Sequence, residues 1–201
     1  MPTPLELVRD EALGCTSCKL AGLGRTQVVF GMGDPEADLL FIGEGPGAEE
    51  DKQGLPFVGR SGKLLDKLLL EELGLTRDAV YIANVVKCRP PGNRDPEPDE
   101  IAACRPWLDR QLELIDPKVV VTLGKFSTQL LLDTKVGITK LRGREYRFGD
   151  AVLIPTVHPA YALRGGGEPL AQMRADLVRA KLALSRTRDE LLAGAADGVT
   201  A

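Results

Sequence analysis

Four short runs of apolar and β-branched residues recur along the chain and predict buried strands. Each run is bounded by turn residues and has the length of a strand covered on both faces of a sheet. The runs are residues 38–43 (DLLFIG), 80–85 (VYIANV), 118–123 (KVVVTL) and 151–157 (AVLIPTV). Segments with helical periodicity alternate with them, at residues 61–73, 99–115, 125–133 and 169–184. This alternation predicts an α/β fold, with an open parallel sheet covered by helices on both sides.

The carboxyl ends of the strands in such a sheet are the place where we expect a ligand to bind. No internal repeat at periods of about 20 to 50 residues and no shift in composition divides the chain. We therefore expect one domain over residues 1–192. The last residues, 193–201 (AGAADGVTA), are small and weakly patterned, and we expect them to form a flexible tail.

The composition of the 201 residues is that of a globular protein with a sizeable core, at 43% hydrophobic and 27% charged residues. It excludes a chain disordered throughout, a collagen-like chain and a coiled coil. The formal net charge of −3 argues against a wholly basic protein that coats nucleic acid, but it is compatible with local basic patches. No apolar run reaches the roughly 18 to 20 residues of a membrane span, and the N-terminus lacks the pattern of a secretory signal. We expect a soluble, cytoplasmic protein without membrane contact.

The four cysteines are spaced like the ligands of a metal site. Cys15 and Cys18 form a C-x2-C pair before the first strand, and Cys88 and Cys104 flank a proline-rich loop at 89–98 (RPPGNRDPEP). A reducing cytosol disfavours disulfides, and a tight turn brings both sulfurs of a C-x2-C pair to one side. Four buried free thiols are the alternative. Zinc and a [4Fe–4S] cluster both accept four thiolates, and one close pair with two dispersed cysteines favours iron and sulfur.

A glycine-rich loop follows the first predicted strand, at residues 43–47 (GEGPG). Three glycines in five residues let backbone amides approach a ligand, although such a loop can also simply turn the chain. It matches neither a Walker loop nor the G-x-G-x-x-G dinucleotide fingerprint. Phe57 lies in a second loop, bounded by proline and glycine (LPFVG, 55–59). It is either a core residue that caps the sheet or a platform on which a planar base stacks.

Two polar residues end the second and the fourth predicted strands. Asn84 offers one acceptor and two donors, the complement of a pyrimidine edge, and its alternative role is that of a turn residue. His158, the single histidine of the chain, precedes a proline and is either structural or functional. Both residues share the predicted edge of the sheet with Phe57 and the glycine-rich loop. This coincidence favours a ligand site more strongly than any one of the residues does.

Four motifs together resemble the family-4 uracil-DNA glycosylases. They are GEGPGAEED (43–51), LPFVGRSG (55–62), IANVVKCRPPGNR (82–94) and HPAYALR (158–164), with cysteines in C-x2-C, KC and AAC positions. The resemblance covers roughly residues 5 to 185, and the joint occurrence of the motifs is far more specific than its parts. It implies a three-layer α/β/α fold around a four-stranded parallel sheet, a [4Fe–4S] cluster, and a hydrolase that excises uracil from DNA in base excision repair.

The resemblance also implies roles for individual residues. The cluster ligands fall on Cys15, Cys18, Cys88 and Cys104. The uracil pocket falls on Glu44, Gly45 and Pro46, where Phe57 stacks on the base, Asn84 reads its pairing edge and His158 faces a carbonyl oxygen. Some members of the wider superfamily carry a water-positioning aspartate where this chain has Gly45, which leaves the identity of a general base open. A related group that crosslinks itself to uracil-DNA has a basic KRRIH-type loop, and this chain lacks that loop.

The expected chemistry begins with extrusion of the nucleotide from the duplex. A fixed Asn84 amide rejects cytosine, because cytosine presents a donor where uracil has an acceptor. His158 and the backbone amides of residues 45–47 stabilise the negative charge that forms on uracil O2. Glu44 positions water or stabilises the cationic sugar. Glu50 walls off the C5 position and excludes the methyl group of thymine.

We expect DNA contacts that are local and electrostatic. Two basic runs are candidates, although each can also be a solvated face: Lys87, Arg89, Arg94 and Arg105, and then Lys140, Arg142, Arg144 and Arg147. The loop after His158 is expected to enter the space that the flipped base leaves, with Arg164 as the wedge. Its DNA-contacting residues are Pro159, Ala160, Tyr161 and Arg164. The expected partner of this monomer is double- or single-stranded uracil-containing DNA at the nucleoid, and its product is free uracil.

Two other classes of function stay open at this point. A noncatalytic module would bind nucleic acid through its cysteine site and basic loops, but it has no need for Phe57, Asn84 and His158 at one sheet edge. A phosphate-handling enzyme would use the loop at residues 43–47, but no Lys/Ser partner pattern accompanies that loop.

Overall fold

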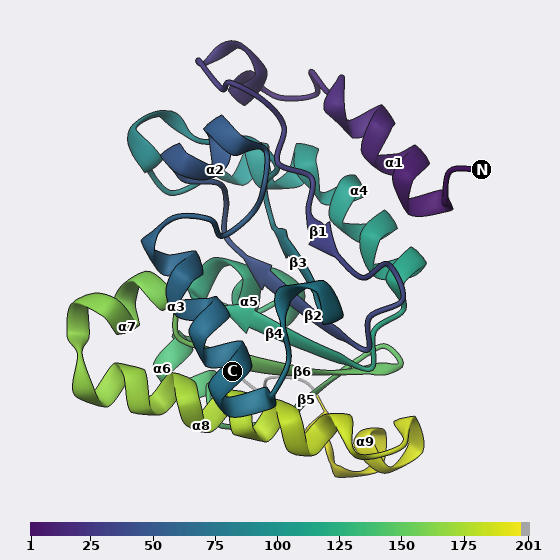
Figure 1. The fold of residues 1–201 in the computed structure, drawn as a ribbon, viewed down its shortest axis with the longest axis vertical. Helices are drawn as coiled ribbons and strands as arrows, with labels where there is room; N and C mark the ends of the chain where they lie inside the picture. Colours follow the sequence, from purple (N-terminus) through teal and green to yellow (C-terminus); the bar gives the residue numbers. More distant parts are fainter. Residues whose placement is uncertain (198–201) are drawn as a thin grey trace.

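The computed structural model describes residues 1–197, and its centre is a six-stranded mixed sheet (Figure 1). The strands are β1 (Met32–Gly33), β2 (Leu39–Gly43), β3 (Tyr81–Asn84), β4 (Val119–Leu123), β5 (Tyr146–Phe148) and β6 (Ala151–Thr156). Their order is β1-β3-β2-β4-β6-β5. Strands β3, β2, β4 and β6 run parallel, and β1 and β5 pair antiparallel at the two edges. The four predicted parallel strands are therefore confirmed, and the antiparallel edge strands β1 and β5 extend the sheet beyond them.

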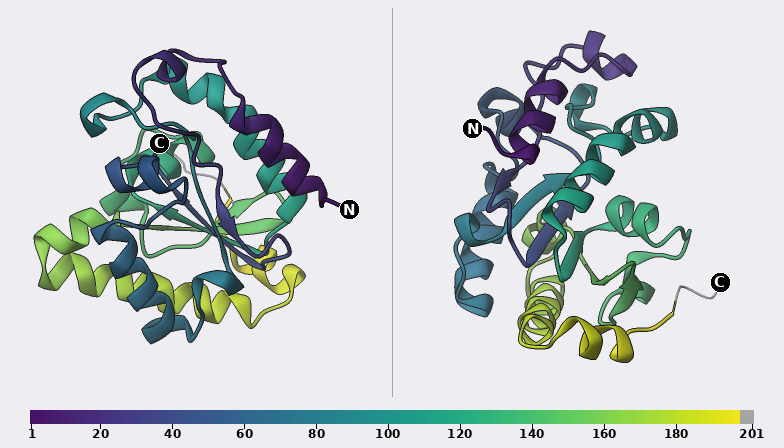
Figure 2. Two further views of the ribbon diagram at one scale, coloured as in Figure 1. Left: turned by 45° about the horizontal axis from the view of Figure 1, so that its top comes forward. Right: turned by 90° about the vertical axis from the view of Figure 1, so that its right-hand side faces the viewer.

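Alternate residues of each strand face two different helical layers. Leu39 and Phe41 of β2 join a core cluster on one face, while Leu40 and Ile42 join a second cluster on the other. Figure 2 shows helices on both sides of the sheet. One layer contains α3 (Arg60–Leu68), α8 (Gly167–Leu184) and α9 (Arg188–Gly194), and the other contains α1 (Pro4–Leu13), α4 (Pro98–Ile115) and α5 (Lys125–Leu131). The three-layer α/β/α architecture is confirmed.

Several elements lie outside the segments that periodicity predicts. They are the helices α1, α2 (Ala48–Gln53), α6 (Ile138–Leu141), α7 (Pro159–Gly165) and α9, with the edge strands β1 and β5. The edge strands have two and three residues, too few to form an apolar run. Helix α1 carried a local signal: the Thr3 hydroxyl accepts from the Glu6 N–H (3.2 Å), and the Glu6 carboxylate accepts from the Thr3 N–H (2.7 Å). This reciprocal pair is a capping box.

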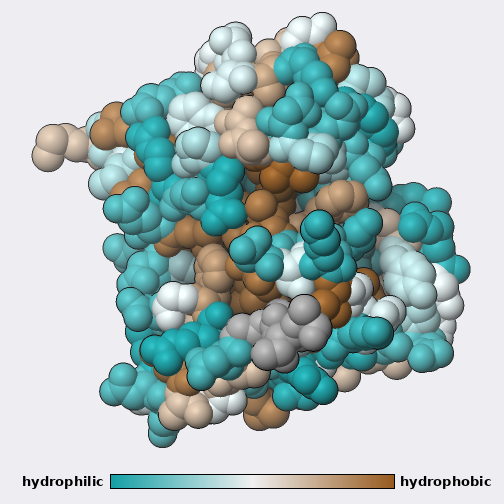
Figure 3. All heavy atoms as spheres, turned by 180° about the vertical axis from the view of Figure 1, so that it is seen from behind, coloured by the Kyte–Doolittle hydropathy of each residue, from teal (hydrophilic) through white to brown (hydrophobic). Residues whose placement is uncertain are grey.

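The core reaches the surface on the side of α4 and α5. Seen from behind, apolar side chains gather across the middle of this face between charged margins (Figure 3). The half-buried side chains of Leu130, Leu132 and Phe148 pack against the core cluster of this layer. Among residues 1–197, no helix is both long and apolar enough to cross a membrane.

The C-terminal segment returns to the edge of the sheet. After α9 ends at Gly194, Ala196 forms a parallel bridge with Tyr146 of β5. The Ala196 N–H donates to the Glu145 carbonyl and the Arg147 N–H donates to the Ala196 carbonyl, both at 3.0 Å. Residues 193–197 of the expected tail are thus attached to the domain, and residues 198–201 lie outside the described part of the chain.

Candidate active site

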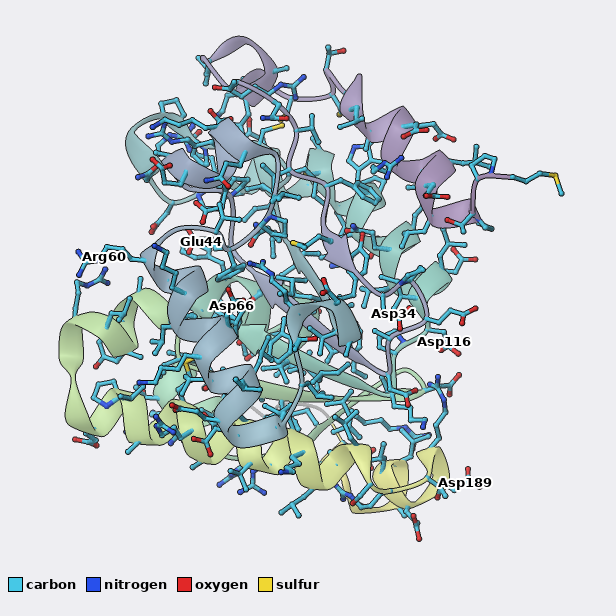
Figure 4. The ribbon with its side chains drawn as sticks, viewed as in Figure 1. Asp34, Glu44, Arg60, Asp66, Asp116 and Asp189 are labelled. Carbon is cyan, nitrogen blue, oxygen red and sulfur yellow. The ribbon has the colours of Figure 1, made fainter. Side chains whose placement is uncertain are left out.

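The carboxyl ends of the parallel strands surround a cavity of about 720 Å³. The predicted residues that line it are Glu44, Gly45, Pro46, Glu50, Phe57, Asn84, His158, Ala160, Tyr161 and Arg164. Pro159 is buried behind the lining. In Figure 4, Glu44 lies at the carboxyl end of β2, whereas Asp34 and Asp116 lie at the opposite end of the sheet. The structure therefore brings the residues of four separate segments to the edge where a ligand was expected.

Gly43, the last residue of β2, allows two of these side chains to lie against the backbone. A Cβ atom at Gly43 would come within 2.5 Å of both the Asn84 Oδ1 atom and the Phe57 ring. Any side chain at this position would push one of them away. The first glycine of the GEGPG loop therefore serves close packing of the site rather than a left-handed backbone turn.

Asn84 presents an unpaired acceptor to the cavity. Asn84 is 1% exposed, and among residues 1–197 no donor contacts its buried Oδ1 atom. A buried acceptor without a partner is costly, and in native proteins such atoms are rare. Its own backbone carbonyl accepts from the Lys87 ammonium (2.7 Å), which fixes the end of β3 from behind. The amide is therefore held ready for a ligand that supplies an N–H donor.

Two rings flank the cavity. The centroids of the Phe57 and His158 rings lie 6.0 Å apart, and the ring planes are inclined at 33°. Phe57 has a φ of 52°, in the left-handed region that a bulky residue rarely adopts. The aromatic ring is thus directed to the cavity by an unusual backbone conformation.

His158 has a neutral imidazole whose Nδ1 atom is a hydrogen-bond acceptor. Its Nδ1 atom accepts the N–H of Ala160 at 3.1 Å, and the residue is the N-cap of α7. Because Nδ1 is an acceptor, the ring proton resides on Nε2. Burial lowers the pKa of His158 to about 4; the positive charge of Arg164 adds to this, and Glu50 opposes it. The imidazole is therefore uncharged at neutral pH.

Glu44 titrates near neutrality. Burial raises the pKa of its carboxyl to about 7, the negative charge of Asp95 adds to the shift, and Lys125 opposes it. A carboxyl of this kind exchanges its proton in the range where most enzymes work, which is typical of functional sites. Glu44 therefore changes its protonation state near neutral pH.

Glu50 joins the two loops of the site. Its carboxylate accepts from the N–H groups of Gly47 (3.1 Å), Val58 (2.9 Å) and Gly59 (2.8 Å). Gly47 belongs to the glycine-rich loop, and the other two follow Phe57 directly. The side chain lines the cavity with its charge already satisfied by backbone donors. It is a rigid part of the wall.

The four cysteines line a second pocket, formed by the N-terminal segment, the loop after β3, and α4. N–H groups are directed at three of the sulfur atoms: Arg25 Nη1 at Cys88 (2.9 Å), Trp107 Nε1 at Cys15 (3.3 Å) and the Lys87 amide at Cys104 (3.2 Å). Within residues 1–197, no three His, Cys, Asp or Glu side chains are arranged to hold a metal ion. The pocket nevertheless gathers all four thiols, and N–H donors are directed at three of their sulfur atoms.

Lys87 of the expected basic runs is too buried to contact DNA, and two arginines of these runs form ion pairs within the protein. Lys87 is 1% exposed, and its ammonium donates to Gln111 Oε1 (2.5 Å) as well as to the Asn84 carbonyl. Arg94 pairs with the buried Glu100 (2.6 Å), and Arg142 pairs with the buried Asp176 (2.9 Å). These three side chains are bound to the protein itself. The exposed members of the second run are Lys140, Arg144 and Arg147.

The structure adds lining residues that the sequence did not indicate. They include Ser61, Asn93, Asp95, Lys125, Phe126, Ile138 and Thr139. Lys125 and Phe126 follow the carboxyl end of β4, so the same strand-end argument that indicated Asn84 would have found them. Asp95 comes from the proline-rich loop, whose path cannot be predicted from hydrophobic periodicity. Only the tertiary fold brings Asp95 near Glu44.

A family model described as the uracil DNA glycosylase superfamily matches residues 30–180. The chain belongs to the uracil-DNA glycosylase superfamily. It is 51% identical over 168 residues to a type-4 uracil-DNA glycosylase of Sulfurisphaera tokodaii, a match that covers 79% of this chain and 76% of that protein. The type-4 enzyme of Saccharolobus solfataricus is 46% identical over 96% of this chain and 94% of its own length. The type-4 enzyme of Thermotoga maritima is 48% identical over 84% of this chain and 88% of its own length.

Within the superfamily, the chain is a type-4 uracil-DNA glycosylase, as the motif resemblance predicts. It is a hydrolase that excises uracil from DNA and acts in DNA repair. Uracil-containing DNA is its substrate. The noncatalytic nucleic-acid module and the phosphate-handling enzyme are set aside by this assignment.

Proposed function

We propose that the cavity receives a uracil flipped out of DNA and that Asn84 reads its pairing edge. The unpaired Oδ1 atom is suited to accept from uracil N3–H, and the amide nitrogen is suited to donate to O4. Cytosine has an acceptor at N3 and a donor at its exocyclic nitrogen. In the same position, its N3 acceptor would face the Asn84 oxygen, and its exocyclic donor would face the amide nitrogen. Cytosine is rejected because neither pair can form a hydrogen bond.

Phe57 stacks on the bound base. Stacking of one base on an aromatic ring contributes roughly 1 to 3 kcal/mol, of the same order as the few kcal/mol that base flipping costs. Uracil opposite guanine is mispaired and costs less to extrude. The stacking contact therefore offsets much of the free-energy cost of base flipping. The lower cost of flipping favours excision of mispaired uracil.

His158 stabilises the leaving group. Breaking the N-glycosidic bond leaves negative charge on uracil O2 and positive charge on the sugar. The neutral imidazole donates its Nε2–H to that oxygen, together with backbone amides of residues 45–47. The low pKa of His158 keeps the ring neutral, so it acts as a hydrogen-bond donor without a net charge.

Glu44 acts on the sugar side. In its ionised form it stabilises the cationic sugar and orients the water that attacks it, which completes hydrolysis to free uracil and an abasic site. Gly45, where other superfamily members carry an aspartate, and Pro46 shape the adjacent wall. Glu50 stands at the C5 side of the base, where its carboxylate, fixed by three N–H groups, leaves no room for the methyl group of thymine.

The start of α7 contacts DNA. Pro159 and Ala160 set the helix in place behind His158, and the exposed side chains of Tyr161 and Arg164 point to the space that the flipped base leaves. Lys140, Arg144 and Arg147 are available to phosphates. The enzyme acts as a monomer on duplex and single-stranded DNA at the nucleoid.

Cys15, Cys18, Cys88 and Cys104 hold a [4Fe–4S] cluster. Iron binds thiolates, and N–H donors directed at three of the sulfurs favour the thiolate form, so the donor set fits this group. The cluster supplies a covalent link between the N-terminal segment, the loop after β3, and α4. Its role is structural. A brown protein with absorbance near 400 nm is expected, and a colourless protein that holds zinc would contradict the assignment.

The observation that carries this proposal is the unpaired Asn84 acceptor in the cavity that Phe57 and His158 also line. Free base is measured by chromatography after incubation with oligonucleotides that contain U:G, U:A, T:G or C:G. The wild-type enzyme releases uracil alone, fastest from U:G. Asn84→Ala loses about 100-fold or more in rate, because the pairing edge is no longer bound.

Thr122→Val is the matched control for this substitution. It removes a buried polar group from β4, which β2 separates from the strand of Asn84, outside the cavity lining, and is expected to retain excision. Near wild-type uracil release by Asn84→Ala, or release of cytosine by the wild-type enzyme, would contradict the proposal.

A further inference from the structure

Phe57 is held in its unusual conformation by charged side chains on both sides of its loop. The N–H groups of Val58 and Gly59 donate to the Glu50 carboxylate at 2.9 and 2.8 Å. On the other side, Arg77 Nη2 donates to the Pro56 carbonyl (2.6 Å) and Nη1 to the Phe57 carbonyl (3.1 Å). Four backbone groups around the ring are therefore fixed by one anion and one cation.

Arg77 itself lies outside the cavity. It belongs to a 3-10 turn, Arg77–Ala79, that precedes β3, and its side chain is 20% exposed. The carboxylate of Asp66, on α3, lies 3.4 Å from Nη1 and orients the guanidinium. Figure 4 shows Asp66 on α3, below the level of Glu44. Arg77 thus reaches the Phe57 loop from behind and cannot touch a ligand in the cavity.

The Phe57 loop packs tightly against α3 on its inner side. A Cβ atom at Gly62, in the first turn of α3, would collide with the Phe57 carbonyl. The backbone of Phe57 therefore rests directly on α3, and Arg77 donates to the same carbonyl. A left-handed φ at a phenylalanine persists only where surrounding contacts over-determine it. Arg77 supplies two of those contacts, and their fork geometry is specific to a guanidinium.

We infer that Arg77 is a positioning residue for uracil recognition: it fixes the Pro56 and Phe57 carbonyls, and thereby keeps the Phe57 ring in place to stack on the base. The inference rests on the proposed function, in which Phe57 stacks on uracil. Without the guanidinium, the two carbonyls turn toward water, φ relaxes out of the left-handed region, and the ring leaves the cavity wall. Binding of the base weakens although no residue of the cavity has changed.

The test compares Arg77→Ala with a matched control, Arg188→Ala. Arg188 is also a partly exposed arginine that donates to backbone carbonyls, those of Asp116 (2.6 Å) and Asp150 (3.2 Å). Asp116 lies at the end of the sheet opposite Glu44 (Figure 4). Binding of free uracil is measured by calorimetric titration, and KM and kcat are measured for uracil excision. Arg77→Ala weakens uracil binding about tenfold, the order of one lost stacking contact, whereas Arg188→Ala binds like wild type.

A double-mutant cycle separates positioning from general stability. Phe57→Ala removes the ring, so Arg77→Ala in that background causes no further loss of uracil binding. Arg77→Lys keeps the charge near Asp66 and the fold, but one ammonium cannot serve both carbonyls in fork geometry. It is expected to show a melting temperature near wild type and a severalfold loss of uracil binding.

The outcomes distinguish the inference from the function on which it rests. If the wild-type enzyme binds no free uracil and releases none from DNA, the proposed function fails. If the wild type binds uracil and the folded Arg77 variants bind it equally well, only the inference is overturned. An equal loss from Arg77→Ala in the presence and absence of the Phe57 ring would overturn it as well.

Discussion

The pKa values of two side chains that line the cavity, Glu44 and His158, are shifted in opposite directions by the same cause. Burial disfavours the charged form, so it raises the pKa of the Glu44 carboxyl to about 7 and lowers that of the His158 imidazole to about 4. Near pH 7 the site therefore holds a neutral donor beside a carboxyl that is in part ionised. This combination suits a reaction that separates charge between uracil and sugar.

The pH dependence of excision follows from Glu44. Its ionised form is the active one, so the single-turnover rate falls as the pH drops through about 7 and levels off above it. Glu44→Gln is expected to excise uracil slowly, and its rate does not fall further as the pH drops. Asp95→Asn removes a negative charge that raises the pKa of Glu44, so the fall in rate moves to lower pH. If Glu44→Gln showed the same fall in rate as the wild type, another group would be responsible for it.

At the residue scale, the sequence predicts the groups that face the ligand better than those that hold them. Asn84 and His158 end strands, and strand ends meet at one edge whatever the details of packing. The partners of Glu50 and Arg77 are backbone groups of residues 47 to 59, which local pattern does not connect to them. Their roles depend on contacts between distant segments and require the structure.

At the scale of elements, α7 connects His158 with the residues that we propose to contact DNA. Its N-cap is His158, whose Nδ1 accepts from Ala160 while Nε2 remains for the ligand. Tyr161 and Arg164 lie one and two turns further on and are exposed. A change in the position of this helix therefore moves the imidazole and the wedge together.

Substitution of the wedge separates duplex from single-stranded substrates. Arg164→Ala is expected to lower excision from duplex DNA severalfold more than excision from a single strand, because only the duplex has a vacated space to fill. Lys181→Ala, an exposed cation on α8, is the control and leaves both rates unchanged. Equal losses on both substrates would argue against the wedge.

The strands with continuous apolar runs were predictable from the sequence, and the short edge strands were not. The four parallel strands are continuous apolar runs and were all predicted from them, whereas β1 and β5 pair only through two and three residues. Helix α2 is short and highly charged, and its place is fixed by Glu50 and by the buried Asp51, which accepts from the Thr26 N–H at 2.9 Å. Such elements owe their position to tertiary contacts, which periodicity does not report.

At the scale of the whole molecule, the cysteine pocket ties the N-terminal segment to the sheet. Arg25 connects this segment to the pocket through Cys88 Sγ and the Cys15 carbonyl (2.6 Å). The Arg110–Glu11 pair joins α4 to α1 (2.6 Å). The pocket and the cavity share the loop after β3, since Asn84 and Cys88 are four residues apart. Loss of the proposed cluster would therefore act on stability first and on the cavity through that loop.

Removal of a ligand tests this arrangement. Cys104→Ser is expected to lose the absorbance near 400 nm and to melt several degrees below wild type, because the segment before β1 is no longer fixed. Protease cleavage within residues 14–27 increases in parallel. An unchanged melting temperature in a protein without the cluster would contradict the structural role.

The net charge of −3 is reconciled with DNA binding by the distribution of cations over the surface. Three basic residues that the sequence offered for DNA are bound internally, to Gln111, Glu100 and Asp176. The exposed cations Lys125 and Arg164 line the cavity, and Lys140, Arg144 and Arg147 of the second basic run are exposed as well.

The central claim is that His158 stabilises the leaving uracil as a neutral donor. The most direct measurement is the single-turnover rate of uracil release from a U:G duplex by His158→Ala, with affinity for an uncleavable 2′-fluoro analogue measured in parallel. Removal of one such donor is expected to lower the rate about 10²- to 10³-fold while affinity changes little. A rate near that of the wild type would contradict the account.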